Sequence, residues 1–265
     1  MPEPILANYH THTTRCHHAT GTETEYIETA IRCGYQVLGF SDHTPWRYKT
    51  PYVSRIRMLP EELRGYVRTL NTLREQYADR IHLHVGLEVE YFPAYVDQLA
   101  EECAELGVEY WVFGCHYDQT DETGIHFGRS STELDLRHYA ELVAAGLETG
   151  RYLYLAHPDI FLNHWPVFDS AAEKTCREVC EAAVHHHIPL EYNLAGLETH
   201  HHSDGSLGYT NDLFWQVAAE YPVQAIVGCD AHAPEELDVV PLLREKQAYL
   251  RGLGIEVLDS LPGLG

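Results

Sequence analysis

Short apolar runs alternate with amphipathic runs along most of this chain. The apolar runs have the length of buried strands, and the amphipathic runs repeat apolar residues at helical spacing. We predict strands over residues 5–10, 36–41, 82–88, 110–115, 152–156, 188–192 and 224–229. We predict helices over residues 23–33, 60–78, 94–106, 132–149, 170–187, 211–220 and 234–251.

Local signals mark the limits of the first two predicted helices. Thr22 or Thr24 is suited to cap the helix over 23–33, and Gly34 is suited to end it. Pro60, followed by two glutamates, is typical of a helix start. Seven strands that alternate with seven helices, with no interrupting linker, predict a parallel sheet closed into one barrel domain over residues 1–265.

Residues that bind metals follow most of the predicted strands. They are His10, His12 and His18, then Asp42 and His43, Glu88, His116, His157, and finally Asp230 and His232. Imidazole and carboxylate are the usual ligands of divalent first-row metals. In a barrel of this kind, catalytic residues come from the carboxyl ends of several strands. The pattern therefore predicts one polynuclear metal site.

The charge of the chain limits its partners. It has 40 acidic and 18 basic residues among 265, a net charge of −22. Nucleic-acid backbones and anionic membranes need a positive field, so we expect neither as a partner. An anionic substrate would have to be attracted locally, by metal ions or by a few arginines. With no signal-peptide pattern and no apolar run of membrane-spanning length, we expect a cytoplasmic protein.

The seven cysteines form no CxxC pair. We interpret them as small buried apolar residues in a reducing compartment, rather than as zinc ligands or disulfides.

The motifs resemble those of the polymerase and histidinol phosphatase (PHP) superfamily, and most closely its histidinol-phosphatase branch. The resemblance runs through the whole chain in order. It is carried by His10-Thr-His12-Thr, Cys16-His17-His18-Ala19, Gly39-Phe40-Ser41-Asp42-His43, Gly86-Leu87-Glu88, Gly114-Cys115-His116-Tyr117, Ala156-His157-Pro158, Asn193-Leu-Ala-Gly196 and Gly228-Cys229-Asp230-Ala231-His232.

The resemblance implies a distorted (β/α)7 TIM-like barrel with three divalent metal ions, which would be Zn, Mn or Fe. One ion would be held by His10, His12, Glu88 and Asp230. Glu88 would bridge to a second ion, held also by His116 and His157. The third would be held by His18, His43 and His232, with His18 rather than His17 selected by the family spacing. Asp42 would orient one of the imidazoles.

The implied reaction is hydrolysis of a small phosphate monoester by a metal-bridging hydroxide. L-histidinol phosphate is the expected substrate, which would place the enzyme in histidine biosynthesis. Glu88 and Asp230 would act through the metals, and His232 or His157 would protonate the leaving group if not fully occupied by metal.

Five residues are candidate substrate contacts. They are Arg15, Arg55 and Arg57 in the loops after the first two strands, and Asn193 and Glu198 in the segment after the sixth. Arginine is suited to bidentate contact with phosphate. Histidinol phosphatases usually carry arginine soon after the Asn193 segment, where this chain has Glu198. His200 to His202 could supply compensating donors, although an exposed loop is the alternative interpretation.

Two other functions stay open at this point. The first is a PHP phosphoesterase for another small phosphate, such as a nucleotide or sugar phosphate. The second is a metal-binding module without catalytic activity. Because all nine ligand positions hold coordinating residues, the sequence favours an enzyme.

Overall fold

The strands follow one another in chain order. In the computed structural model, which describes residues 5–202 and 204–264, eight strands pair in the order β1 to β8. The pairs β1–β2, β2–β3, β5–β6 and β7–β8 are parallel. Thr11, past β1, also forms a parallel bridge with Ala231, past β7. This order, with helices between the strands, confirms the predicted TIM-like (β/α) fold class.

The described residues divide into two units. Unit 1 takes the described parts of Met1–Val112, Gly228–Leu242 and Asp259–Gly265, and unit 2 takes Phe113–Val227 and Leu243–Leu258. Each unit is built from separate stretches of chain. The prediction of a single domain over 1–265 stays a prediction.

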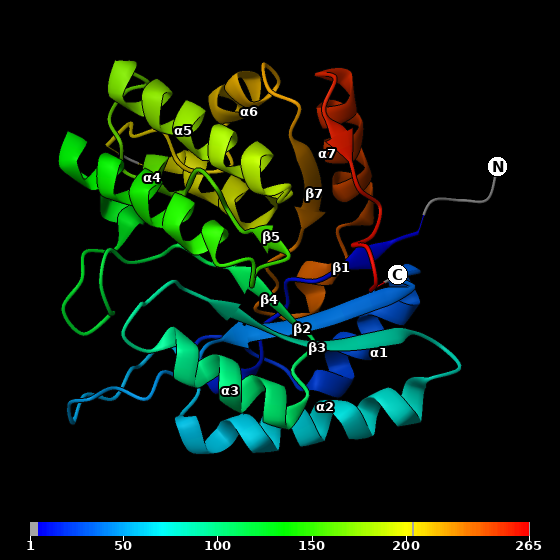
Figure 1. Cartoon of the computed structure of the whole chain (residues 1–265). Coiled ribbons are helices and arrows are strands. Elements are labelled where there is room, and N and C mark those ends of the chain that lie inside the picture. Colours follow the sequence, from blue (N-terminus) through cyan, green and yellow to red (C-terminus); the bar gives the residue numbers. More distant parts are fainter. Residues whose placement is uncertain (1–4, 203, 265) are drawn as a thin grey trace. The chain divides into compact units, whose positions relative to one another are not determined.

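Unit 1 contains the first strands and the helices between them. Helix α2 packs on β3 (Figure 1). The strands are β1 (Ala7–Asn8), β2 (Val37–His43), β3 (His82–Val89) and β4 (Tyr110–Phe113), whose last residue is counted in unit 2. The helices are α1 (Glu23–Cys33), α2 (Leu63–Tyr77) and α3 (Val96–Leu106), with short 3-10 turns η1 (Thr14–Cys16), η2 (Pro60–Glu62) and η6 (Pro234–Leu237).

Unit 2 contains the later strands, and its helices α4 and α5 pack on each other. The strands are β5 (Tyr154–Leu155), β6 (Leu190–Asn193), β7 (Gln224–Gly228) and β8 (Glu256–Val257). The helices are α4 (Glu133–Glu148), α5 (Ser170–His186), α6 (Asp212–Ala218) and α7 (Val240–Gly252). The 3-10 turns are η3 (Phe127–Arg129), η4 (Ile160–Leu162) and η5 (Ala195–His201). Gly228 of β7 and the first turn of α7 belong to unit 1.

Local sequence signals set both ends of helix α1. Thr22 caps it, because its side chain accepts from the Glu25 backbone N–H while the Glu25 carboxylate accepts from the Thr22 backbone N–H. Gly34 ends it in the left-handed conformation, at φ 87°. Both predicted signals are confirmed, and Thr22 rather than Thr24 is the cap.

Two glycines let a tyrosine cross the sheet of unit 1. The Tyr110 hydroxyl donates to the Tyr9 carbonyl at 2.8 Å. A Cβ on Gly39 would collide with that hydroxyl, and one on Gly86 would collide with the Tyr110 ring. Glycine is therefore required at both positions for close packing rather than for an unusual backbone angle.

Each predicted strand and helix has a counterpart in the structure, with differences in extent and one additional strand. β8 was not predicted, and the first strand covers Ala7–Asn8 rather than 5–10. The predicted helices over 60–78 and 234–251 each begin with a separate 3-10 turn before the α-helix. None of the described helices is both long and apolar enough to cross a membrane. All seven cysteines are free, and all except Cys33 are buried.

Candidate metal centre

The backbone beyond β1 pairs with the backbone beyond β7 and sets three predicted ligands side by side in unit 1. The His12 N–H donates to the Ala231 carbonyl at 2.8 Å, and the Ala231 N–H donates to the His10 carbonyl at 3.1 Å. Asp230 adopts a left-handed backbone conformation at φ 51°. Such strain in a non-glycine residue is typical of functional sites, where the surrounding structure holds it.

The side chains of these residues converge. The Asp230 Oδ1 lies 3.0 Å from His12 Nε2 and 3.3 Å from His10 Nε2. His10 and His12 are fully buried. A buried carboxylate oxygen shared by two imidazole nitrogens is a donor set that suits a divalent cation.

Glu88, at the end of β3, reaches the same group. Its Oε2 lies 3.6 Å from the Nε2 atoms of both His10 and His12, and 2.8 Å from His43 Nδ1. The register places His43 of β2 directly beside Glu88. One carboxylate oxygen thus faces three imidazoles, as a bridging ligand would.

A second imidazole group lies beside the first. The ring nitrogens of His18, His43 and His232 lie within 4.8 Å of one another. His18 Nε2 and His232 Nε2 are 3.1 Å apart. The His12 and His232 rings stack, with centroids 4.0 Å apart. The seven predicted ligands of unit 1 therefore form one continuous cluster.

Asp42 supports the cluster without joining it. Its Oδ1 lies 3.5 Å from His12 Nδ1, on the side of the ring opposite Asp230. It accepts hydrogen bonds from the His43 backbone N–H at 2.8 Å and from the hydroxyl and backbone N–H of Thr13. This is the geometry of a carboxylate that orients a metal-binding imidazole.

The electrostatics of the cluster suit a bound cation. Burial opposes charge on His12, but hydrogen bonds to Asp230 and Asp42 outweigh it and raise the His12 pKa to about 9. Burial also opposes ionisation of Asp230, yet the neighbouring His10 and His12 hold its pKa well below the usual value. Two carboxylates, one beside each ring nitrogen, thus favour positive charge on His12, and a metal ion would replace a proton of this ring.

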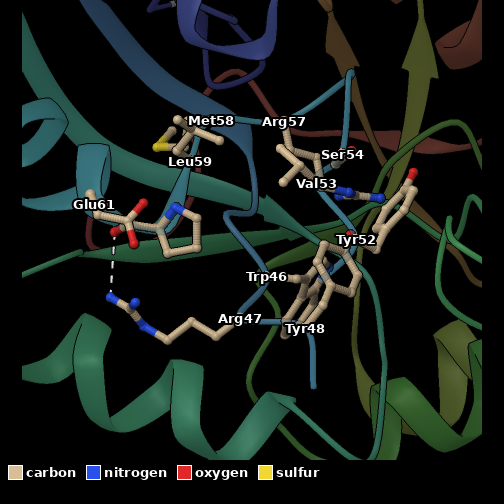
Figure 2. Close-up of a pocket in the computed structure, with 11 residues that line it drawn as sticks. Trp46, Arg47, Tyr48, Tyr52, Val53, Ser54, Arg57, Met58, Leu59 and Glu61 are labelled. Carbon is tan, nitrogen blue, oxygen red and sulfur yellow. Dashed lines mark hydrogen bonds between the residues drawn. The ribbon is translucent and has the colours of Figure 1, made fainter. Parts of the chain in front are cut away.

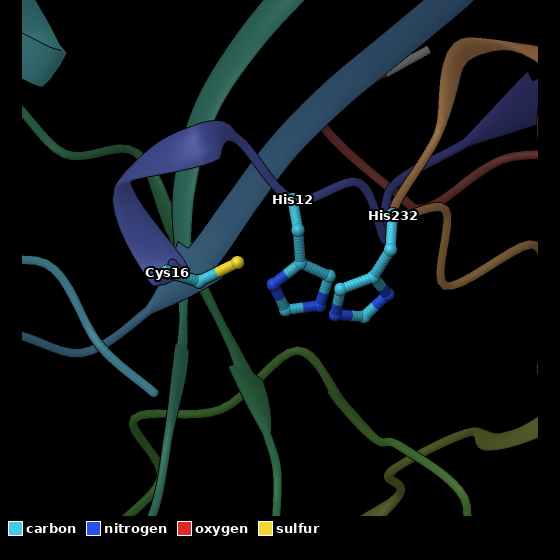
Figure 3. A group of neighbouring side chains, drawn as sticks. All are labelled: His12, Cys16 and His232. Atoms are coloured by element: carbon cyan, nitrogen blue, oxygen red, sulfur yellow. The ribbon is translucent and has the colours of Figure 1, made fainter. Parts of the chain in front are cut away.

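Cys16 also faces this cluster, which the sequence did not indicate. Its thiol and the ring nitrogens of His12 and His232 lie within 4.8 Å of one another (Figure 3). Burial, and then the charge of Asp42, raises the Cys16 pKa to about 12. Burial thus favours the neutral thiol, in keeping with the interpretation of a small buried residue.

The other two predicted ligands lie in unit 2. The rings of His116 and His157 have centroids 4.9 Å apart. His157 has a left-handed backbone, at φ 30°, and its N–H donates to Glu191 at 3.2 Å. Asn193 donates to the same carboxylate at 2.9 Å. Buried Glu191 was not among the predicted residues, because an acidic residue inside an apolar strand carries no motif of its own.

The three arginine candidates differ in their surroundings. Arg15 pairs with Glu23 and lies over the Tyr66 ring, and Arg55 is exposed. Arg57 is only 1% exposed and forms a two-bond ion pair with Glu90, at 2.9 and 2.5 Å. Its guanidinium is thus bound to a carboxylate of its own unit.

The remaining candidates lie in and after β6. Asn193 is fully buried, and its side chain also accepts from the Gly196 N–H at 3.0 Å. Glu198 is exposed in η5. Of the histidine run, His200 contacts the Tyr209 carbonyl and His202 contacts Asn163, each at 2.9 Å.

The geometry can be compared with known proteins. The family model described as PHP domain matches residues 8–195, which include most of the predicted ligands. The chain belongs to the PHP domain family.

Relatives and solved structures agree with this membership. The chain is 26% identical over 245 residues to a protein of Deinococcus radiodurans named probable histidinol-phosphatase, and the match covers 88% of each chain. It is 24% identical over 143 residues to the histidinol-phosphatase of Bacillus subtilis, covering 51% of each. The histidinol phosphate phosphatase of Lactococcus lactis, solved with zinc, L-histidinol and phosphate, superposes with a TM-score of 0.68.

The Lactococcus lactis structure bears on the fold. It covers 96% of this chain and 95% of its own, at 16% identity. Such low identity shows the fold alone. The chain therefore shares the fold of that structure, in agreement with the TIM-like (β/α) fold class that the sequence predicted.

Proposed function

We propose that this PHP protein hydrolyses L-histidinol phosphate to L-histidinol and inorganic phosphate, with bound divalent metal ions. The observation that carries the proposal is the cluster in unit 1, where one oxygen of Glu88 faces three imidazoles and one oxygen of Asp230 faces two. Relatives named as histidinol-phosphatases support the choice of substrate.

The ligand assignment follows the family pattern. His10, His12, Glu88 and Asp230 would hold the first ion. Glu88 with His116 and His157 would hold the second, and His18, His43 and His232 the third. The distances within unit 1 support the first and third sets. The set with His116 and His157 rests on the family pattern. Imidazole with carboxylate accepts Zn, Mn or Fe.

When bound, such ions supply a water of lowered pKa and positive charge for the phosphate oxygens. The chain's own residues bind and orient. Asp42 fixes the ring of His12, and Glu191 fixes the backbone of His157. A ring nitrogen of His157 or His232 that is not taken by a metal ion would protonate the leaving alkoxide. Among the arginines, Arg15 and Arg55 stay candidates for the phosphate, together with Asn193 and Glu198 for the rest of the substrate.

Phosphate release tests the proposal. The metal-replete protein is given L-histidinol phosphate or p-nitrophenyl phosphate, before and after treatment with a chelator. We expect turnover of L-histidinol phosphate with the higher kcat/KM, loss of turnover on chelation, and recovery when zinc or manganese is returned. Full metal occupancy with no turnover of either ester would instead indicate a metal-binding module without catalytic activity.

A further inference from the structure

A pocket of about 280 Å³ lies in unit 1, in the segment that follows β2 (Figure 2). Its lining includes Trp46, Arg47, Tyr48, Tyr52, Arg57 and Glu61. None of the predicted metal ligands lines it. Any group in this pocket would therefore contact side chains other than the metal ligands.

The pocket and the metal cluster are close along the chain at the end of β3. Glu90 directly follows this strand, two residues and roughly 7 Å of extended chain after Glu88. Glu88 faces the imidazoles, whereas Glu90 accepts from Trp46 Nε1 at 3.0 Å and from the guanidinium of Arg57. Trp46 itself follows His43 by three residues. Of these two carboxylates, Glu88 contacts the metal cluster and Glu90 contacts two side chains that line the pocket.

The charges around the pocket disfavour a phosphate group inside it. The Arg47 guanidinium bonds Glu102 at 2.7 and 3.0 Å, and that of Arg57 bonds Glu90. Exposed Glu61 lies at the rim. Both guanidiniums that line the pocket are therefore paired with carboxylates outside its lining, and Glu61 adds a third carboxylate within it. This balance favours a neutral or cationic group over an anion.

The aromatic rings favour a flat or cationic group. Tyr48 and Tyr52 meet edge to face, with centroids 5.1 Å apart. The neighbouring Lys49 ammonium already lies 5.3 Å from the Tyr95 ring centroid, and Tyr95 packs on Tyr48. The faces of such rings attract cations and stack on other rings.

We propose that this pocket binds the alcohol part of the phosphate ester, a ring-bearing amino alcohol, while the metal cluster takes the phosphate. Tyr48, Tyr52 and Glu61 would then determine specificity for the alcohol. The inference rests on the proposed phosphatase function and assigns the residues that recognise the leaving group.

Product binding tests the assignment without requiring turnover. L-histidinol and inorganic phosphate are titrated separately, by calorimetry, into the metal-replete protein and its Tyr52→Ala and Glu61→Gln variants. We expect each variant to bind L-histidinol roughly tenfold more weakly, because a ring contact or a charge contact is lost. Phosphate binding should not change. Tyr52→Phe, which keeps the ring, should bind L-histidinol nearly as wild type does.

The control is Tyr221→Ala, which removes a tyrosine that contacts Glu181 in unit 2. Exposed Glu61 can be changed without loss of folding, so that variant decides the matter even if Tyr52→Ala unfolds. Wild-type affinity for L-histidinol in Glu61→Gln would overturn the inference, and so would wild-type affinity in a folded Tyr52→Ala. A loss of phosphate affinity equal to the loss of L-histidinol affinity would also overturn it, because it would place the phosphate in the pocket.

A parallel assay separates this inference from the function on which it rests. Failure of the wild-type protein to release phosphate from L-histidinol phosphate would contradict the proposed function. Release by the wild type, with unchanged kcat/KM in both variants, would contradict only the assignment of the pocket.

Discussion

Single residues around the cluster have separable roles, and Asp42 is the clearest case. It contacts the His12 ring from the side away from Asp230, and it is tied to the backbone by Thr13 and His43. The carboxylate can orient an imidazole without occupying a coordination position. Its replacement should therefore weaken metal binding without emptying the site.

We predict that Asp42→Asn lowers metal affinity and turnover by about 10- to 100-fold, as loss of a carboxylate that orients a ligand does elsewhere. Competition with a chromophoric chelator measures the affinity. The matched control is Asp79→Asn, at an exposed aspartate. Equal affinity in Asp42→Asn and wild type would show that the carboxylate does not orient His12.

Glu109 gives a pH dependence of stability. Burial raises its pKa, but hydrogen bonds from His84 and the Val85 N–H, with Arg74 close by, lower it overall. A lowered folded-state pKa stabilises the protein above the unfolded pKa, and this stabilisation is lost as the pH falls through the folded value.

Glu109→Gln should therefore lower the free energy of unfolding at neutral pH, with a smaller difference from wild type at about pH 3.5. Urea denaturation at the two pH values measures both differences. A difference that does not shrink in acid would contradict an electrostatic origin.

At the scale of elements, the crossing of Tyr110 over β2 and β3 can be tested by paired substitutions. Gly39→Ala puts a methyl group against the Tyr110 hydroxyl, and Gly86→Ala puts one against the ring. Each should destabilise the protein by about 1–3 kcal/mol, the usual cost of overpacking.

Tyr110→Phe should partly rescue Gly39→Ala, because it removes the hydroxyl in contact, and it should not rescue Gly86→Ala. A double-mutant cycle of unfolding free energies measures both couplings. Equal rescue of the two glycine variants would contradict the geometry.

The sequence was informative about elements wherever a local signal was strong. The helical spacing of apolar residues, with the Thr22 and Gly34 signals, predicted both ends of α1 correctly. β8 was missed because its two residues, Glu256 and Val257, are too few to form a pattern. Pro60 marked a helix start correctly, but the 3-10 geometry of that first turn depends on packing that composition does not encode.

For the same reason, some residues of the site could be predicted from the sequence and others could not. His10, His12, Glu88 and Asp230 could be predicted because ligands at strand ends share one edge of a parallel sheet. The ion pair of Arg57 with Glu90 and the support of His157 by Glu191 depend on tertiary contacts between distant residues. The spacing of residues along the chain does not predict such contacts.

At the scale of the molecule, metal ions should contribute to stability as well as to catalysis. Unit 1 buries Glu88 and Asp230 in one cluster. A cation that binds only the folded state stabilises it by an amount that grows with the logarithm of the ligand excess over Kd. At a hundredfold excess over Kd, the stabilisation is about 2.7 kcal/mol.

We therefore expect chelation to lower the Tm, and zinc or manganese to restore it. The shift should be smaller in Asp230→Asn, which removes a charge from the cluster. Differential scanning calorimetry measures the shift. A Tm that does not respond to metal in the wild type would show that the cluster binds none.

The central claim is that these imidazoles and carboxylates hold metal ions, and anomalous diffraction from crystals of the zinc-replete protein tests it most directly. We predict anomalous peaks at the zinc edge about 2.0–2.2 Å from the facing atoms of His10, His12 and Asp230, and their loss from His12→Ala or Asp230→Ala crystals in which the fold is retained. A metal-replete wild-type crystal without a peak among these side chains would contradict the claim.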